Sequence, residues 1–472
     1  MSEDSGPRKI MSIEEVDKVL HIGNPPSGVP AYIVYFLTLA ILVVGFYRLA
    51  LLIGGNWGAI QFILSMLGGT VVPYANIILT FILVIFALAI LGAFIFLVLI
   101  RKTAKHFLYF IMLMFPILSI GFGVLLFVLI QDVTYGLVFV GLGVLGLLFF
   151  FLVRRKIELA GELLQLSAKA VLDEKGALLA TSLSVIISSI VAIATLLTGL
   201  YVVELVTGYI SNEWLPVVFL AVMFLGSWGS GFIVYLFDGA IIGIIHDWYR
   251  SPEVDVASFG RGLKRALDVK GGIATFALLM ATLRLLTEQA KKGREKSFIG
   301  ALIAFIAGVA YELVRFLTYY TLPAMVIRKT NFTEGIKDSM NKLKDLFVET
   351  LISYFGFGKV LALLGFIVMI FYAGSGYLVG AYLLYPILAA DFVGLTPVAI
   401  GVTSALGTLL IGLIPTILIF RTVSIAFNGI LYEFGLDLEF ANKGITLPSR
   451  LPDKIKQDFL AILEEKGATI RI

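Results

Sequence analysis

The segment Gly-Ser-Trp-Gly-Ser at 226–230 interrupts an apolar stretch of the chain, and an aspartate, Asp238, follows it. An ionised carboxylate that faces hydrocarbon costs at least about 2.5 kcal/mol, and the short aspartate stem reaches the headgroups poorly. Small residues two to three turns earlier allow a neighbouring helix to approach closely. We therefore expect Asp238 to face the protein interior and to have a polar partner there.

Three basic residues are candidate partners for this aspartate. Lys359 is the first choice, because it follows Gly356 and Gly358, which weaken a helix. Arg48 and Arg421 are the alternatives, and so is water at the level of the headgroups near the inner surface. The sequence leaves open whether the aspartate acts in a solute or ion pathway, in a structural ion pair or in an exposed interfacial position.

Aromatic residues lie near the same break, with Trp228 inside it and Tyr235 shortly after it. Aromatic faces attract quaternary ammonium groups with about 0.5–2 kcal/mol per contact, so together with an acid they would suit a small cationic solute. Tryptophan and tyrosine also form belts at membrane interfaces, which is the alternative interpretation. The candidate residues of a substrate or ion pathway are Asp238, Lys359, Trp228 and Tyr235.

Other charged residues have structural interpretations. Glu312 and Arg315 are three residues apart on an expected helix and can form an ion pair. His246 and Asp247 precede a tryptophan and a tyrosine, which is typical of an anchor at the inner membrane interface. The chain has no cysteine and only three histidines, so we predict no catalytic residue, no metal site and no cofactor.

The composition predicts the fold class. Hydrophobic residues make up 59% of the 472 residues and charged residues 14%, against about 45–50% and about 25% in soluble domains. This composition predicts an all-α, polytopic integral membrane helical bundle. The net charge of +4 comes with basic residues that cluster in loops, so nucleic acid is not expected as a partner.

Eight apolar segments are long enough to cross about 30 Å of hydrocarbon. The connections at 54–71, 131–135, 208–214 and 378–397 contain no lysine or arginine, whereas the other connections are basic. The positive-inside rule therefore predicts that both termini lie in the cytoplasm. The expected spans are 31–53, 73–100, 107–130, 136–153, 178–207, 215–247, 347–377 and 398–425.

The region 271–327 contains two further apolar segments whose flanks are all basic. Either both cross the membrane, which would place the basic segment 291–296 outside, or neither does. We favour two helices that lie partly in the cytoplasmic interface, with re-entrant or spanning helices as the alternatives.

Both ends of the chain show helical amphipathic patterns. Apolar residues share one helix face over 12–22 and again over 451–466. We expect both helices to lie on the inner membrane surface. The expected organisation is a cytoplasmic segment at 1–30, a multi-span domain at 31–440 and a cytoplasmic tail at 441–472.

The order of motifs from about residue 232 to 440 resembles the C-terminal half of the choline-transporter-like family of solute carriers, and also an uncharacterised family of prokaryotic polytopic membrane proteins. The likeness rests on DGAIIGIIHDWYR, SFGRGLKRALDVKGGIATFALLMATLRLLTEQ, TYYTLPAMVIRKTNFTEGIKDSMNKLKD and FRTVSIAFNGILYEFGLDLE. The chain lacks the large extracellular domain that follows the first span in animal members, with only residues 54–71 at that place. No site residue of the family carries over.

The resemblance and the glycine-broken span near charged residues favour a choline-transporter-like transporter or channel for a small, cationic solute. A non-transporting membrane scaffold or assembly protein is the main alternative, because no internal repeat is visible. A membrane-embedded lipid enzyme is the third hypothesis. The expected partners are membrane lipids and the solute, the expected location is the cell membrane, and the formation of a homo-oligomer is left open.

Overall fold

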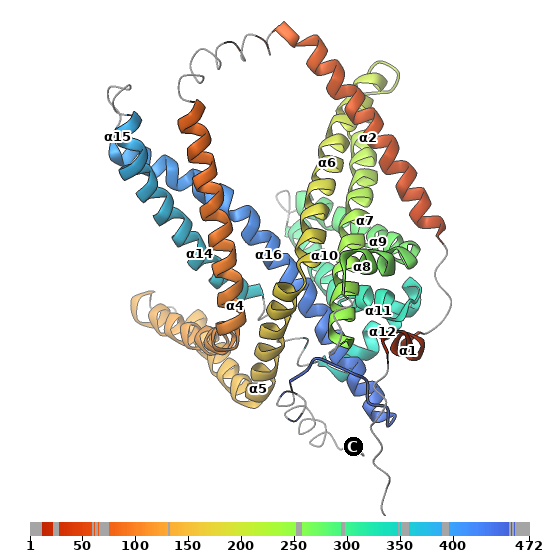
Figure 1. Cartoon of the computed structure of the whole chain (residues 1–472), viewed down its shortest axis with the longest axis vertical. Coiled ribbons are helices and arrows are strands. Elements are labelled where there is room, and N and C mark those ends of the chain that lie inside the picture. The colour runs from red at the N-terminus through yellow and green to blue at the C-terminus, as the bar shows by residue number, and fades with distance from the viewer. Residues whose placement is uncertain are drawn as a thin grey trace, which may run out of the picture. The chain divides into compact units, whose positions relative to one another are not determined.

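In the computed structural model of the chain, residues 12–21, 28–58, 61, 65, 75–130, 133–251, 257–293, 298–347, 350, 358–388, 396–452, 455 and 457 are described. Among them the regular elements are all helices, and no strand occurs (Figure 1). This confirms the all-α fold class.

Eight of the described helices are long and apolar enough to cross a membrane, so the protein is a multi-pass membrane protein. Their apolar side chains are widely exposed on the helix surfaces, as expected where lipid covers them. The eight candidates are Val29–Gly55, Leu83–Val128, Val133–Asp173, Lys175–Val206, Leu215–Arg250, Lys270–Lys291, Ala362–Leu384 and Pro397–Asn442.

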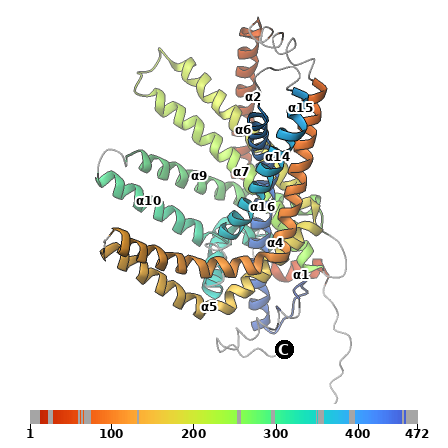
Figure 2. The same cartoon turned by 90° about the vertical axis from the view of Figure 1, so that its left-hand side faces the viewer.

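These helices agree in number with the sequence prediction but differ from it in where the spans lie. Of the span expected over 347–377, residues 348–349 and 351–357 lie outside the described residues, and the described candidate there is Ala362–Leu384. The expected spans 73–100 and 107–130 belong to one continuous helix, α4 (Ala75–Leu125), because the basic segment between them contains no proline or glycine that would end a helix. The helix changes direction partway along its length instead (Figure 2). Helix α9 (Lys270–Gly293) is also long and apolar enough to span, although its course relative to the bilayer stays a prediction.

The chain divides into two compact units, each made of segments that are not contiguous in sequence. The first unit comprises Met1–Ile78, Glu174–Leu343 and Leu447–Arg450. It contains α1 (Ile13–Leu20), α2 (Val29–Gly55), α6 (Lys175–Val206), α7 (Leu215–Arg250), α8 (Phe259–Asp268), α9, α10 (Phe298–Leu317), α11 (Thr321–Arg328) and most of α12 (Phe332–Asp345).

Helix α7 is the centre of the first unit and contacts α1, α2, α6, α8, α9 and α11. Figures 1 and 2 show it beside α6, with which it makes a long antiparallel pair. Glycine permits the close approaches: a methyl group on Gly45 of α2 would lie 2.6 Å from the Ala194 carbonyl oxygen of α6. Such contacts between small residues are a common basis of helix association in membranes.

The second unit comprises Leu79–Asp173, Lys344–Thr446 and Leu451–Ile472. Its centre includes Tyr372 of α14 (Gly358–Leu378), whose hydroxyl donates a hydrogen bond of 2.9 Å to the Ala89 carbonyl oxygen and lies 3.1 Å from Thr416 Oγ1. The described elements are α4, η2 (Leu126–Ile130), α5 (Val133–Asp173), α14 (Gly358–Leu378), η4 (Val379–Leu384), α15 (Tyr385–Leu388) and α16 (Pro397–Asn442).

The N-terminal amphipathic helix has the expected bounds and packs on other helices. A capping box starts α1, in which Glu15 N donates to Ser12 Oγ and Ser12 N donates to the Glu15 carboxylate. Val16 and Leu20 are fully buried, and α1 packs on α7 and α11. Val16 and Leu20 on its apolar face are thus covered by protein, and the location of α1 at the inner membrane surface stays a prediction. Most of the C-terminal helix expected over 451–466 lies outside the described residues.

Candidate functional site

A cavity of about 570 Å³ lies at the glycine-serine segment of α7, within the first unit. Three helices line it, α6, α7 and α9, and all three are candidate membrane spans. Its polar lining consists of backbone at the glycines together with side chains that could contact a solute: Thr195, Ser227, Ser230, Tyr235, Arg284, Glu288 and Gln289.

The glycines of this segment set the width of the cavity. A methyl group on Gly226 would overlap Thr195 of α6, and one on Gly229 would overlap Thr38 of α2. On Gly231, by contrast, the nearest atom to such a group would be the Ala277 methyl at 3.9 Å. Gly226 and Gly229 therefore bring neighbouring helices into direct contact, as the sequence predicts, while Gly231 faces open space.

The two aromatic candidate residues both contact α9 from α7. Trp228 is buried, and its Nε1 donates a hydrogen bond of 3.0 Å to the Ala274 carbonyl oxygen. The Tyr235 ring lies 4.8 Å, centre to centre, from that of Phe276 and also lines the cavity. Tyr235 is thus accessible to a solute, whereas Trp228 is not among the described residues that line the cavity.

Asp238 lies one turn beyond Tyr235 on α7 and is 9% exposed, so it faces the protein interior as expected. The adjacent Gly239 packs against Ala266 of α8 and Val326 of α11, where several elements meet. Lys359 belongs to the second unit, where its Nζ lies 4.4 Å from the centre of the Phe115 ring. The pairing of Asp238 with Lys359 stays a prediction.

Two other arginines of the sequence analysis have partners nearby. Arg48 of α2 forms an ion pair with Glu204 of α6 and lies over the Tyr201 ring, so a surface contact explains this charge without Asp238. Arg315 Nη1 lies 3.7 Å from Glu312 Oε1 on α10, and both side chains are exposed. These pairs are structural contacts outside the cavity.

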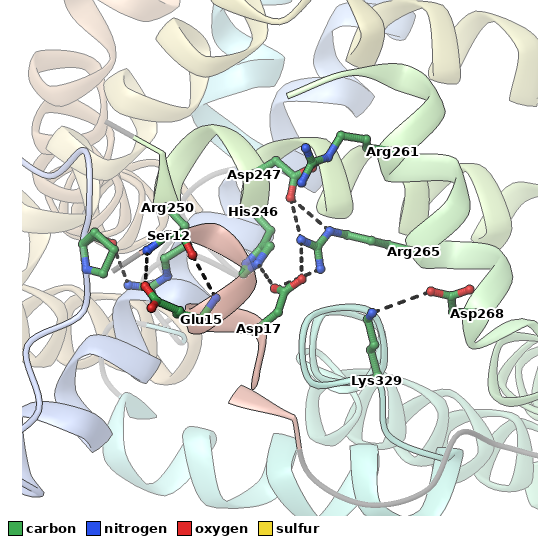
Figure 3. A network of polar contacts seen from close by, with 11 residues as sticks. Ser12, Glu15, Asp17, His246, Asp247, Arg250, Arg261, Arg265, Asp268 and Lys329 are labelled. Carbon is green, nitrogen blue, oxygen red and sulfur yellow. Dashed lines mark hydrogen bonds and ion pairs between the residues drawn. The ribbon is translucent and has the colours of Figure 1, made fainter. Parts of the chain in front are cut away.

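A second polar cluster surrounds the end of α7 and joins residues whose proximity the sequence does not predict (Figure 3). Asp17 of α1 accepts from Arg265 of α8, with Asp17 Oδ1 to Nη1 at 3.1 Å and Oδ2 to Nη2 at 2.8 Å. His246 Nε2 lies 3.1 Å from Asp17 Oδ1. Burial would raise the pKa of the Asp17 carboxyl, but the contacts with His246 and Arg265 outweigh burial and hold that pKa well below its usual range.

Asp247 completes this cluster from α7. Its Oδ1 accepts from Arg265 Nε at 3.0 Å and lies 2.8 Å from Arg265 Nη2, while its Oδ2 forms an ion pair with Arg261 Nε at 3.2 Å. Burial lowers the pKa of the Arg265 guanidinium, but the charges of Asp247 and Asp17 raise it above its usual value. Arg265 therefore stays charged and binds both carboxylates.

Glycine contacts bring this arginine within reach of α7. A methyl group on Gly262 of α8 would overlap the Ala240 carbonyl oxygen, and one on Gly243 would lie 3.0 Å from the Gly262 Cα. The two helices thus touch through their backbones one turn before Arg265 and Asp247. Their charged side chains meet where bulkier residues would hold the helices apart.

The chain segment 447–450 also binds the end of α7. Arg450 N donates to the Tyr249 carbonyl oxygen at 2.9 Å, and the Arg450 guanidinium donates to the Ser251 carbonyl oxygen and lies over the Trp248 ring. Arg250 donates to the Pro448 carbonyl oxygen at 3.2 Å. Segments from both ends of the chain therefore hold this helix end.

The interpretation of His246 and Asp247 as an interfacial anchor is wrong, since both side chains are fully buried in protein. The sequence contained one signal: a histidine and an aspartate adjoin an apolar run, and Arg261 and Arg265 are four residues apart and share a helix face. Opposite charges of similar number in two neighbouring helices indicate a structural network as readily as a membrane anchor.

The cluster joins elements and offers no group for chemistry. Its carboxylates are engaged by arginine and histidine, and among the described residues no group of three or more His, Asp or Glu side chains could hold a metal ion. The cavity beside Tyr235 is the better candidate for solute binding, because its polar side chains are accessible.

A comparison with known protein families gives a match. The family described as plasma-membrane choline transporter matches residues 137–439, which is more than half of the chain. No curated protein matches the chain. The matched range contains every helix that lines the cavity, together with Asp238 and Lys359.

Proposed function

Because the chain belongs to the plasma-membrane choline transporter family, we propose that it carries a small cationic solute across the membrane through the cavity beside Tyr235. The observation that carries this proposal is the accessible polar lining at a glycine-rich segment of otherwise apolar helices. A non-transporting scaffold needs no such cavity, and a lipid enzyme needs a set of reactive groups that the described lining of the cavity does not bring together.

The size and chemistry of the cavity fit a small molecule. Its volume of about 570 Å³ lies within the roughly 300–1,000 Å³ of typical ligand sites. Tyr235 offers an aromatic face, which attracts an organic cation, and the lining also includes the Glu288 carboxylate further along α9. We assign to Asp238, one turn further along α7, a place on the path that a cation follows.

Replacement of Tyr235 tests the proposal that its ring binds the solute. With the protein in proteoliposomes, we expect uptake of radiolabelled choline above that of empty liposomes, and a KM raised several-fold in Tyr235→Ala through the loss of about 0.5–2 kcal/mol of cation–π attraction. Tyr235→Phe keeps the aromatic face and should stay within about twofold of the wild type. Unchanged KM in Tyr235→Ala would exclude this ring from the site, and uptake no greater than in empty liposomes would favour the scaffold hypothesis.

We also propose that both termini and the basic loops face the cytoplasm, which the positive-inside rule supports. Because the chain has no cysteine, a single cysteine can report on this orientation. With Lys337→Cys, an exposed position of α12, we expect no reaction with an impermeant thiol reagent in intact cells and full reaction after permeabilisation. Labelling in intact cells would show that residue 337 lies outside the cell and would contradict the proposed orientation.

A further inference from the structure

We propose that Arg284 and Glu288 form an exchangeable ion pair that makes the site selective for cations. An entering cation displaces the Arg284 guanidinium and binds the Glu288 carboxylate in its place. The inference rests on the proposed function and adds to it the two residues that determine specificity. Both residues lie on α9 and line the cavity.

The geometry makes the pair accessible from the cavity. Arg284 Nε lies 2.9 Å from Glu288 Oε1, and the two side chains are 72% and 53% exposed. The cavity-lining residues Ala281, Arg284, Leu285 and Glu288 follow the i, i+3, i+4, i+7 spacing of a single helix face. Arg284 and Glu288 therefore lie on the face of α9 that borders the cavity.

The pair is weak enough to exchange. Exposed ion pairs at i, i+4 on a helix change an equilibrium constant by only about twofold, and the order with arginine first is the less favourable one. A cation that binds the Glu288 carboxylate therefore displaces only a weak contact. Arg265, which is 7% exposed and binds two carboxylates, offers no comparable exchange.

Charge in the cavity explains the selectivity. Arg284 and Glu288 are the charged residues among its described lining, so the empty site is neutral. When a cation binds Glu288, the released guanidinium adds a positive charge nearby and opposes binding. Arg284 thus lowers the affinity of the site for every cation. It also neutralises the charge of the Glu288 carboxylate when the site is empty.

The test compares binding of radiolabelled choline to the purified, full-length protein in Arg284→Gln, Glu288→Gln and the double variant, with uptake measured in parallel. Glu288→Gln should raise the Kd for choline at least about tenfold, because it removes the opposite charge. Arg284→Gln should lower that Kd about twofold to tenfold, because it removes a competitor. 3,3-Dimethyl-1-butanol, the neutral isostere of choline, should compete for the site, and its Ki in each variant should differ from that of the wild type by less than about twofold.

The outcomes separate this inference from the proposed function. Opposite shifts for the two single variants support the exchange, because a merely structural pair would shift both Kd values in the same direction. Shifts in the same direction, or equal shifts for choline and its neutral isostere, overturn the exchange while wild-type uptake leaves the transport proposal standing. Absence of both binding and uptake in the wild type would overturn the two together.

Discussion

Replacing Gly231 with tryptophan is expected to lower solute uptake at least about tenfold while the protein stays folded. The Cβ of a residue at this position would meet only the Ala277 methyl, at 3.9 Å, and Gly231 lines the cavity, so we expect the indole to extend into the cavity. The side chain would occupy space that our proposal assigns to the solute. Uptake in proteoliposomes and thermal unfolding in detergent measure the two parts of this prediction.

Two alanine variants in the same helix serve as controls. Gly231→Ala adds one methyl group to open space and should preserve uptake, with stability unchanged or raised by up to about 1 kcal/mol from the better helix propensity. Gly226→Ala should destabilise the protein by about 1–3 kcal/mol, because the new methyl overlaps Thr195, whose β-branched side chain is stiff. Wild-type uptake in Gly231→Trp would show that the solute does not pass through this cavity.

Replacing Arg265 with methionine is expected to destabilise the protein by about 3–5 kcal/mol, the usual cost of leaving buried charge without its partner. The change removes the hydrogen bonds of Arg265 to both Asp17 and Asp247, and Asp247 is fully buried. We expect a lower melting temperature and faster proteolysis near residues 12–21, since α1 loses an ion pair that holds it on α7 and α8. Differential scanning fluorimetry and limited proteolysis measure both effects.

The matched control is Arg261, which contacts the same Asp247 carboxylate but is 44% exposed. Arg261→Met should cost less than about 1 kcal/mol, because solvent screens an exposed pair. Equal losses of stability for the Arg261 and Arg265 variants would show that burial does not determine the strength of this cluster.

Asp17 adds a pH dependence of known sign to the same prediction. Its pKa in the folded protein lies below the value of about 3.9 in the unfolded chain, so the unfolded state binds the proton more readily. The stabilisation is present above about pH 4 and is lost as the pH falls further. Asp17→Asn should therefore narrow the difference between the melting temperatures at pH 7 and pH 3, and an unchanged difference would contradict this role of Asp17.

The sequence by itself determined the membrane class, most of the spans and the close packing at Gly226 and Gly229. Hydrophobic length is a local property, because about twenty apolar residues cross the hydrocarbon whatever surrounds them. Close packing could be predicted because small residues two to three turns before Asp238 let a neighbouring helix approach. A charge in an apolar segment needs such a neighbour as a polar partner. The continuous helix α4 escaped prediction, because a basic segment with good helix formers resembles a loop between two spans.

Only the tertiary structure decided which surfaces meet. The apolar face of α1 has the same pattern whether lipid or protein covers it, so its packing on α7 and α11 could not be predicted from periodicity. Asp17 lies 229 residues from His246 and 248 from Arg265 in sequence, and charge alone does not select one distant partner among many. The cavity beside Tyr235 likewise depends on tertiary packing, because α6 and α2 approach α7 closely at Gly226 and Gly229, whereas space remains beside Gly231.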